Sequence, residues 1–156
     1  MVNTTIGYHP ASAAAIVHGL AKRKQATGRD VWLIHTSGTS NLGDQPITGA
    51  FIESESERVF DDSKDDIYSY EKMRNAKQQY GQRDAELCVI DTGLQTGVKT
   101  LIIMSPTIFG AGTGLFNKSS IQVPGYVKAA LKNMQSVIIG EGLGIWDRVH
   151  IEDLAE

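Results

Sequence analysis

Two groups of small polar residues follow the most apolar runs of this chain. The first, Thr36-Ser37-Gly38-Thr39, closes the run that begins at Val31. Hydroxyl side chains just past a strand can hydrogen-bond a carboxamide or a substrate hydroxyl, or they can pair with amides of their own turn. The second, Ser105-Pro106-Thr107-Ile108-Phe109-Gly110, is either a rigid exit that packs against a flat ring or a plain turn. Ligands of parallel sheets bind beyond the carboxyl ends of strands, so both groups are candidate sites.

A glycine-rich segment, Gly110-Ala111-Gly112-Thr113-Gly114, has the composition of a phosphate-binding loop but not its setting. It does not follow the preceding strand directly, because the six-residue segment 105–110, whose last residue is the first glycine of this loop, comes after that strand, and it does not open a helix directly. A dinucleotide fingerprint instead holds the pyrophosphate at a helix N-terminus. We therefore predict a flexible loop here.

Metal and disulfide chemistry have little support. No two of the four histidines lie at metal-ligand spacing, so we predict no metal site. The single cysteine, Cys88, excludes an internal disulfide, fits a reducing compartment, and lies on an apolar helix face where it is expected to be inert core. The histidines are His9, His18, His35 and His150.

The elements that must position these residues alternate between helix and strand. Apolar spacing predicts helices over 11–26, 67–96 with a break at Gly81, and 119–133 with Pro124 marking its effective start. Continuously apolar runs predict buried strands over 31–34, 98–104 and 137–139. The acidic run from Glu53 to Asp66 reads as a solvated loop.

This order indicates an α/β fold with parallel pairing and right-handed crossovers. The first predicted element is a helix. The two strands with the clearest pattern are apolar on both faces, so we expect each to pair with further strands on both sides. The sequence therefore predicts one partial domain over 1–156, the middle of a larger doubly wound sheet.

The net charge and the distribution of apolar residues argue against several classes of protein. A net charge of −3 gives no reason to expect nucleic acid or an anionic membrane as partner. No apolar run approaches the roughly 20 residues that span a bilayer, and the N-terminus lacks the pattern of a secretory signal. We expect a cytoplasmic protein whose partner is a small-molecule substrate.

Near the C-terminus, Gly140-Glu141-Gly142-Leu143-Gly144 leads into Val149-His150-Ile151-Glu152-Asp153-Leu154, where carboxylates sit in the first turn of a helix. Together with 34–39, Gly97-Val98-Lys99-Thr100 and 105–110, this segment resembles the extended short-chain dehydrogenase/reductase family. The likeness is to its atypical, epimerase/dehydratase-like or NmrA-like members. It covers nearly the whole chain from about residue 11.

The resemblance implies a Rossmann-type fold, NAD or NADP as cofactor, and hydride chemistry at a carbinol or carbonyl carbon. It also implies that the N-terminal nucleotide-binding half, with its glycine-rich fingerprint, is missing, so the chain reads as a fragment. Residues 105–156 would lead into the substrate-side region. The implied cofactor-binding residues are Thr36, Ser37, Pro106, Thr107 and Ile108.

The family's chemistry uses Tyr-x-x-x-Lys with a serine or threonine, the tyrosine carrying the proton and the lysine lowering its pKa. A literal match, Tyr68 and Lys72, places both side chains on one helix face. Spacing to the next strand favours a second register, in which Gln78 and Gln82 stand at the tyrosine and lysine positions. The catalytic residues implied by the first register are Ser37, Tyr68 and Lys72.

Two further departures from the family concern the substrate. The place of the catalytic hydroxyl falls on Gly38, where Ser37 or Thr39 would substitute. Trp146 stands where sugar-nucleotide enzymes carry a diphosphate-binding arginine, and Arg148 is out of register. The resemblance thus implies a substrate side made of Thr39, Trp146, Arg148 and His150.

Two functions remain open, beside a third hypothesis that the chain is a non-functional remnant with an exposed sheet edge. One is an NAD(P)-dependent oxidoreductase or epimerase-like enzyme for a small carbonyl or alcohol, impaired in this chain. The other is a non-catalytic Rossmann-type module that senses dinucleotide or binds a protein. Whether the chain is an enzyme is left undecided by the residues, and an uncovered sheet edge predicts self-association.

Overall fold

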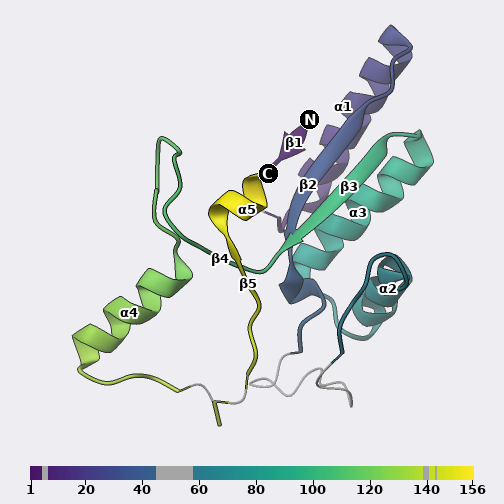
Figure 1. The fold of residues 1–156 in the computed structure, drawn as a ribbon. Helices are drawn as coiled ribbons and strands as arrows, with labels where there is room; N and C mark the ends of the chain where they lie inside the picture. The colour runs from purple at the N-terminus through teal and green to yellow at the C-terminus, as the bar shows by residue number, and fades with distance from the viewer. Residues whose placement is uncertain (5–6, 45–57, 139–140, 143) are drawn as a thin grey trace. The chain divides into compact units, whose positions relative to one another are not determined.

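The structure is a computed structural model that describes residues 1–4, 7–44, 58–138, 141–142 and 144–156. These residues form two compact units, Met1–Met104 and Ser105–Glu156 (Figure 1). Part of the acidic run, including Glu53, Glu55 and Glu57, lies outside the described residues.

The first unit is a parallel sheet with helices, in strand order β1-β2-β3. β1 and β2 pair in parallel, with Val2 opposite Ile34 and Asn3 opposite His35, and β3 runs in the same direction as β2 (Figure 1). This is the α/β architecture of a partial Rossmann-like fold, as predicted. The elements are β1 (Val2–Asn3), α1 (Pro10–Thr27), β2 (Trp32–Gly38), the 3₁₀ turn η1 (Thr39–Asn41), α2 (Ile67–Lys77), α3 (Gly81–Thr96) and β3 (Lys99–Ser105).

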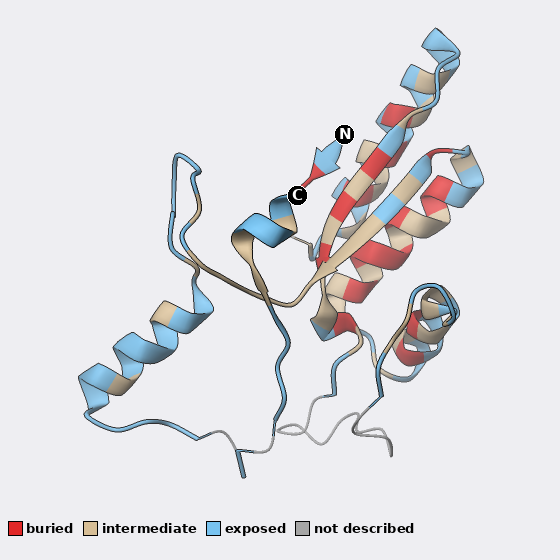
Figure 2. Ribbon diagram, in the orientation of Figure 1, coloured by how far each residue is buried: buried red, intermediate tan, exposed pale blue. Residues whose placement is uncertain are grey.

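Helices α1 and α3 lie side by side on one face of this sheet (Figure 1). Buried residues of these two helices and of β2, coloured red on the ribbon in Figure 2, form the core. Leu33, His35 and Ser37 of β2 alternate with less buried neighbours, since successive strand residues face opposite ways. Cys88 on α3 is half-buried rather than fully in the core. The apolar core consists of Ala13, Val17, Leu20, Leu33, Val89 and Val98.

Gly93 allows α3 to approach β3 closely. A Cβ at this position would lie 2.7 Å from Thr100 Cγ2 and 3.1 Å from the Val98 carbonyl oxygen, whereas one at the exposed Gly19 of α1 would meet nothing within 4 Å. We expect Gly93→Ala to lower the free energy of unfolding by about 1–3 kcal/mol through overpacking. Gly19→Ala should raise it by up to about 1 kcal/mol through helix propensity. Urea unfolding measures both, and equal stabilisation by the two would contradict this account.

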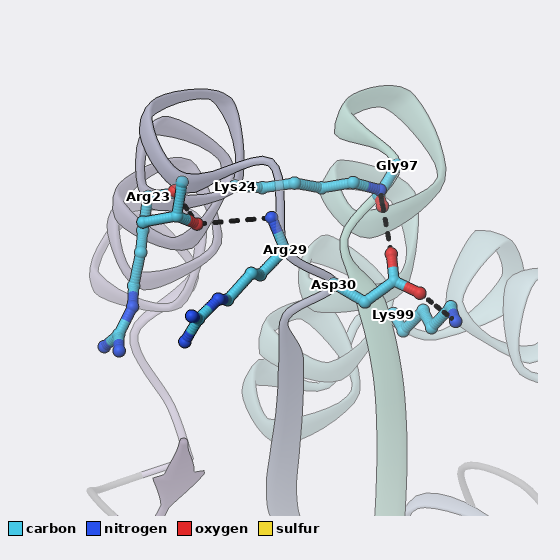
Figure 3. A network of polar contacts seen from close by, with 7 residues as sticks. Arg23, Lys24, Arg29, Asp30, Gly97 and Lys99 are labelled. Atoms are coloured by element: carbon cyan, nitrogen blue, oxygen red, sulfur yellow. Dashed lines mark hydrogen bonds and ion pairs between the residues drawn. The ribbon is translucent and has the colours of Figure 1, made fainter.

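A polar network ties the amino ends of β2 and β3 to the helices that precede them (Figure 3). Lys24 donates to the Gly97 carbonyl at 2.7 Å and lies 3.7 Å from Asp30, and Lys99 lies 2.7 Å from Asp30. Gly28 and Gly97 end α1 and α3 with φ of 65° and 68°, the left-handed conformation that favours glycine. These ion pairs are exposed, so we expect each of them to contribute little to the free energy of unfolding.

The second unit holds a small parallel sheet in which Thr107 lies opposite Arg148 and Phe109 opposite His150. The glycine-rich segment that precedes α4 turns back on itself, because the Gly112 amide donates to the Lys118 carbonyl at 2.7 Å. It therefore opens no helix. The elements are β4 (Thr107–Phe109), α4 (Gln122–Asn133), β5 (Arg148–His150) and α5 (Ile151–Ala155).

Several element predictions were wrong. β1 precedes α1, so the first element is a strand, and its two residues are too few to show a periodic pattern. Thr107–Phe109 pairs as a strand where a strand exit was expected. Of the strand predicted over 137–139, Val137 and Ile138 belong to no strand and are 69% and 71% exposed, and Ile139 lies outside the described residues.

The helix predicted over 67–96 is two helices. The break falls on Gln78–Tyr80, where Gln78 and Tyr80 have extended backbones, and Gly81 is the first residue of α3. α4 begins at Gln122, two residues before Pro124. Proline is tolerated there because the first-turn amides of a helix have no partner within the helix.

Candidate functional site

Four polar side chains gather at the carboxyl edge of the first unit's sheet, and we call them the hydroxyl cluster: Tyr8, Ser40, Tyr80 and Gln82. Tyr8 lies between β1 and α1, Ser40 follows β2, and the other two stand at the start of α3. The Ser40 hydroxyl donates to Gln82 Oε1 at 2.7 Å. Tyr80 Oη lies 3.3 Å from Ser40 Oγ, from Gln82 Oε1 and from Tyr8 Oη.

The backbone at Gly38 forms one wall of this cluster. A Cβ at Gly38 would lie 2.9 Å from Gln82 Nε2, so the end of β2 and the start of α3 touch there. The two tyrosine rings meet edge to face, with centroids 6.1 Å apart. The hydrogen bond to Tyr80, followed by burial, raises the pKa of Tyr8. The hydroxyl and amide groups of the cluster can both donate and accept hydrogen bonds.

Beneath the hydroxyl cluster lie four buried ionisable side chains, the charged cluster: Glu71, Arg74, Arg83 and Glu86. Each is at most 1% exposed. Arg83 donates through Nε and Nη2 to the Asn41 carbonyl at 3.0 and 2.7 Å, and Arg74 donates to the carbonyls of Leu42 and Gly43.

The two guanidinium groups thus clamp the turn Thr39–Gly43, which carries Ser40. The sequence carries a signal for this cluster. Glu71 and Arg74 on α2, and Arg83 and Glu86 on α3, are opposite charges three residues apart, a spacing that puts two side chains on one helix face.

Ser37 belongs to the charged cluster's hydrogen-bond network and not to a free surface. It is 5% exposed, and the Asn41 amide donates to Ser37 Oγ at 3.1 Å and to Glu86 Oε2 at 2.6 Å. Burial raises the pKa of Glu86, and burial followed by the Glu86 charge raises the pKa of Glu71 to about 8. Burial also lowers the pKa of Arg83.

The predicted pair Tyr68 and Lys72 is brought together on α2, but at another place. Lys72 Nζ donates to Tyr68 Oη at 3.1 Å and lies 3.8 Å from Asp91, and the Tyr68 hydroxyl donates to the same carboxylate. The hydrogen bond with Tyr68, followed by the Asp91 charge, raises the pKa of Lys72. Asp91 stands nine residues beyond Gln82, about 13 Å along α3 at the rise of a helix.

In the second register, Gln78 and Gln82 stand at the family's tyrosine and lysine positions. Of these two, Gln82 belongs to the hydroxyl cluster at the end of β2. Gln78 caps α2, and its carbonyl accepts from Arg83 at 3.1 Å. Sequence reasoning missed Tyr8, Ser40 and Tyr80. No pattern marks them, because they come from three separate segments that only the fold brings together.

The remaining predicted residues of the first unit are Thr36 and Thr39. Thr36 lies on β2 and Thr39 opens η1, and both are half-buried. The Thr39 carbonyl accepts from the amides of Leu42 and Gly43 at 3.0 and 3.1 Å, which closes the turn. Thr39 therefore shapes the loop that presents Ser40.

In the second unit, the predicted residues surround the β4–β5 pair. His150 packs edge to face against Phe109, with ring centroids 5.2 Å apart, and its Nδ1 accepts the Glu152 amide at 3.4 Å to cap α5. The ring also fills the space beside Gly110, where a Cβ would lie 2.4 Å from His150 Nε2. Pro106, Thr107 and Ile108 are half-buried, whereas Trp146 and Arg148 are exposed.

Comparison with known proteins decides the family. The model of the NAD dependent epimerase/dehydratase family matches residues 12–156. This chain belongs to the NAD-dependent epimerase/dehydratase family. It is also similar to the oxidase ucsJ of Acremonium sp, with 26% identity over 150 residues, which are 95% of this chain and 41% of the relative. The chain therefore spans less than half the length of that protein.

The epimerase/dehydratase family implies a nicotinamide dinucleotide, and the described residues fit one end of it. The neutral donors and acceptors of the hydroxyl cluster suit a ribose or a carboxamide. Three groups that could bind a diphosphate are already engaged: Arg74 and Arg83 donate to turn carbonyls, and the Ser12 amide at the start of α1 is capped by His9 Nδ1 at 3.1 Å.

No group of three or more histidine, cysteine, aspartate or glutamate side chains able to hold a metal occurs in the described ranges. No helix among those residues has the length and apolar character to cross a membrane.

Proposed function

We propose that this chain forms the nicotinamide-side and substrate-side part of an NAD(P)-dependent oxidoreductase that acts on a small carbonyl or alcohol. The observation that carries the proposal is the hydroxyl cluster, which stands at the carboxyl edge of a parallel sheet, where such folds bind ligands. The name of the similar protein, an oxidase, agrees with redox chemistry.

In this proposal the hydroxyl cluster holds the substrate oxygen. The Ser40 hydroxyl is oriented by its bond to Gln82 Oε1 at 2.7 Å, and Tyr80 Oη lies 3.3 Å from the same serine. Tyr80 can then donate a hydrogen bond to a carbonyl oxygen or accept one from an alcohol. The nicotinamide, when bound, supplies or accepts the hydride. Thr36, Pro106, Thr107 and Ile108 remain its predicted contacts, whereas Ser37, also predicted, is engaged in the buried network of Asn41 and Glu86.

We expect turnover by this chain alone to be weak or absent. Gln82 carries no positive charge and so cannot supply the electrostatic help that the family's lysine gives, although the Arg83 guanidinium carbon lies 5.6 Å from the centre of the Tyr80 ring. Lys72, the literal match for the family's lysine, instead bonds Tyr68 at 3.1 Å. The predicted catalytic set Ser37, Tyr68 and Lys72 would have to act from a buried network and from a distant helix face.

The neutral Gln82 at the lysine position also favours a second function, a non-catalytic module that senses the dinucleotide. A neutral amide at the lysine position retains hydrogen bonding but loses the electrostatic assistance that proton transfer needs. The two functions differ in one measurement, the oxidation of NADH or NADPH in the presence of aldehydes and ketones. Binding without oxidation supports the sensor.

Binding of NADH and NADPH to the full chain tests the site itself. We expect Tyr80→Phe or Ser40→Ala to weaken binding about 2- to 12-fold, the loss of one hydrogen bond of about 0.5–1.5 kcal/mol. Tyr68→Phe is the matched control, because it removes a tyrosine hydroxyl from the outer pair on α2. Isothermal calorimetry gives the dissociation constants, and circular dichroism checks that each variant is folded.

Two results would oppose the proposal. One is a folded chain that binds neither dinucleotide, and the other is a Tyr68→Phe variant that weakens binding as much as Tyr80→Phe. A cytoplasmic location and self-association through the sheet edge stay predictions.

A further inference from the structure

Two glutamates meet inside the first unit. Glu71 of α2 is 0% exposed and Glu86 of α3 is 1% exposed. Glu86 accepts hydrogen bonds from the Asn41 amide at 2.6 Å and from the Ser37 hydroxyl. The two oxygens of Glu71 accept no hydrogen bond of good geometry in the described part of the structure, although Asn41 lies close enough to lower the Glu71 pKa, and Asn41 Oδ1 has no donor there either. Buried polar atoms of native proteins are almost always paired, so this arrangement calls for a donor.

A proton is the donor that the surroundings allow. Glu71 faces Glu86, and two carboxyl groups can hydrogen-bond each other only when one is protonated. Arg83, whose charge lowers the pKa of Glu71, directs N–H groups to the carbonyls of Asn41 and Gln78, and Arg74 donates to the carbonyls of Leu42 and Gly43. Two ionised carboxylates in a buried site repel and lose their hydration, so one of them holds a proton.

We propose that Glu71 and Glu86 share one proton at neutral pH and that this carboxyl pair positions the turn Thr39–Gly43. The proton resides on Glu71, which donates to the Glu86 carboxylate, and Glu86 in turn holds Asn41 of the turn. Its loss places a second negative charge beside Glu86 and weakens the hold on the turn that presents Ser40. This inference does not rest on the proposed function, because protonation and folding report it without any ligand.

The other ionisable groups around the pair do not give the same pH dependence. Arg74, Tyr70 and Tyr80 face Arg83, and the guanidinium groups stay charged throughout. His35 of β2 is buried, and burial lowers its pKa from 6.5. A histidine of this kind binds a proton more tightly in the unfolded chain, so its contribution to stability rises with pH and approaches its full value about one unit above 6.5.

Glu71 acts with the opposite sign. Its folded pKa of about 8 exceeds the ordinary 4.5, so the folded chain binds one more proton than the unfolded chain between these values. The unfolding equilibrium constant should therefore rise about tenfold per pH unit in that window and level off above the folded pKa. Between pH 6.5 and 8, the stability contribution of His35 rises slightly and then levels off, whereas that of Glu71 falls, so the two changes have opposite signs.

The test is urea unfolding of the full chain across pH 6.5 to 8, followed by Trp32 fluorescence in a Trp146→Phe background. Glu71→Gln keeps the shape and a donor but cannot ionise, and Asp62→Asn is the control for removal of an exposed carboxylate. We expect the fall in stability with pH in the parent and in Asp62→Asn, and no fall in Glu71→Gln. An unchanged slope in folded Glu71→Gln overturns the proposal.

Infrared spectroscopy of the parent gives an answer even if Glu71→Gln does not fold. Ordinary carboxyl groups are ionised well below pH 6.5, so the C=O stretch of a protonated acid at that pH reports a buried one. We expect this band at pH 6.5 and its loss as pH rises past about 8. Absence of the band at pH 6.5 overturns the proposal.

Discussion

Arg83→Met is expected to lower the free energy of unfolding of the first unit by about 3–5 kcal/mol, as when one partner of a buried ion pair is removed. Arg83 is 1% exposed, and its charge offsets that of Glu86. Methionine fills similar space but leaves a buried carboxylate without a cation. It also removes the hydrogen bonds that Arg83 donates to the carbonyls of Asn41 and Gln78.

Urea unfolding, again followed by Trp32 fluorescence, measures this loss. Arg23→Met on the exposed face of α1 is the control and should change stability by less than about 0.5 kcal/mol. The double variant Arg83→Met/Glu86→Gln should be more stable than the sum of its single changes predicts, because the uncompensated charge is gone. Strict additivity of the two changes would show that the charges are not coupled.

Leu33→Ala is expected to cost about 2–5 kcal/mol, the range for large-to-small changes in a closed core. Leu33 is 0% exposed and lies on β2 against α1 and α3, where it packs with Val17 and Val89. Its removal leaves a cavity that two helices and a strand cannot easily close. Loss of this packing should also displace the carboxyl end of β2, and with it Ser40.

Leu101→Ala on the neighbouring strand β3 is the matched control. Leu101 is 48% exposed, so the same chemical change removes much less buried surface. We expect less than half the effect of Leu33→Ala, by the same unfolding measurement. Equal effects would mean that the outer face of the sheet is covered in solution by something outside the described residues.

The long elements could be predicted from the sequence because each carries its own local signal. The helix predicted over 11–26 is α1, ended by Gly28 as expected, and the strand predicted over 98–104 is β3 within one residue. The strand-to-helix junction at Val149-His150-Ile151 is β5 followed by α5. A glycine with positive φ or a run of apolar residues acts over a few positions, so a reader of the sequence can find it.

The short strands could not be predicted in the same way. β1 and β4 have two and three residues, and their pairing is decided by a partner far along the chain. Val137 and Ile138 show the reverse error, since an apolar pair records hydrophobicity but not whether a neighbouring strand exists.

The sequence by itself determined the family, the α/β class and the edge of the sheet to be searched, because these depend on motif order and on strands that end in polar turns. It also placed Tyr68 and Lys72 on one helix face, as the structure has them. Only the tertiary structure decided which polar side chains meet. Tyr8, Ser40 and Tyr80 come from three segments, and Glu71 and Glu86 become a proton-sharing pair only because α2 and α3 bury them together. Burial changes the pKa of a side chain, and proximity allows hydrogen bonds between residues that are far apart in the sequence. Both arise only when the chain packs, so the sequence alone does not reveal them.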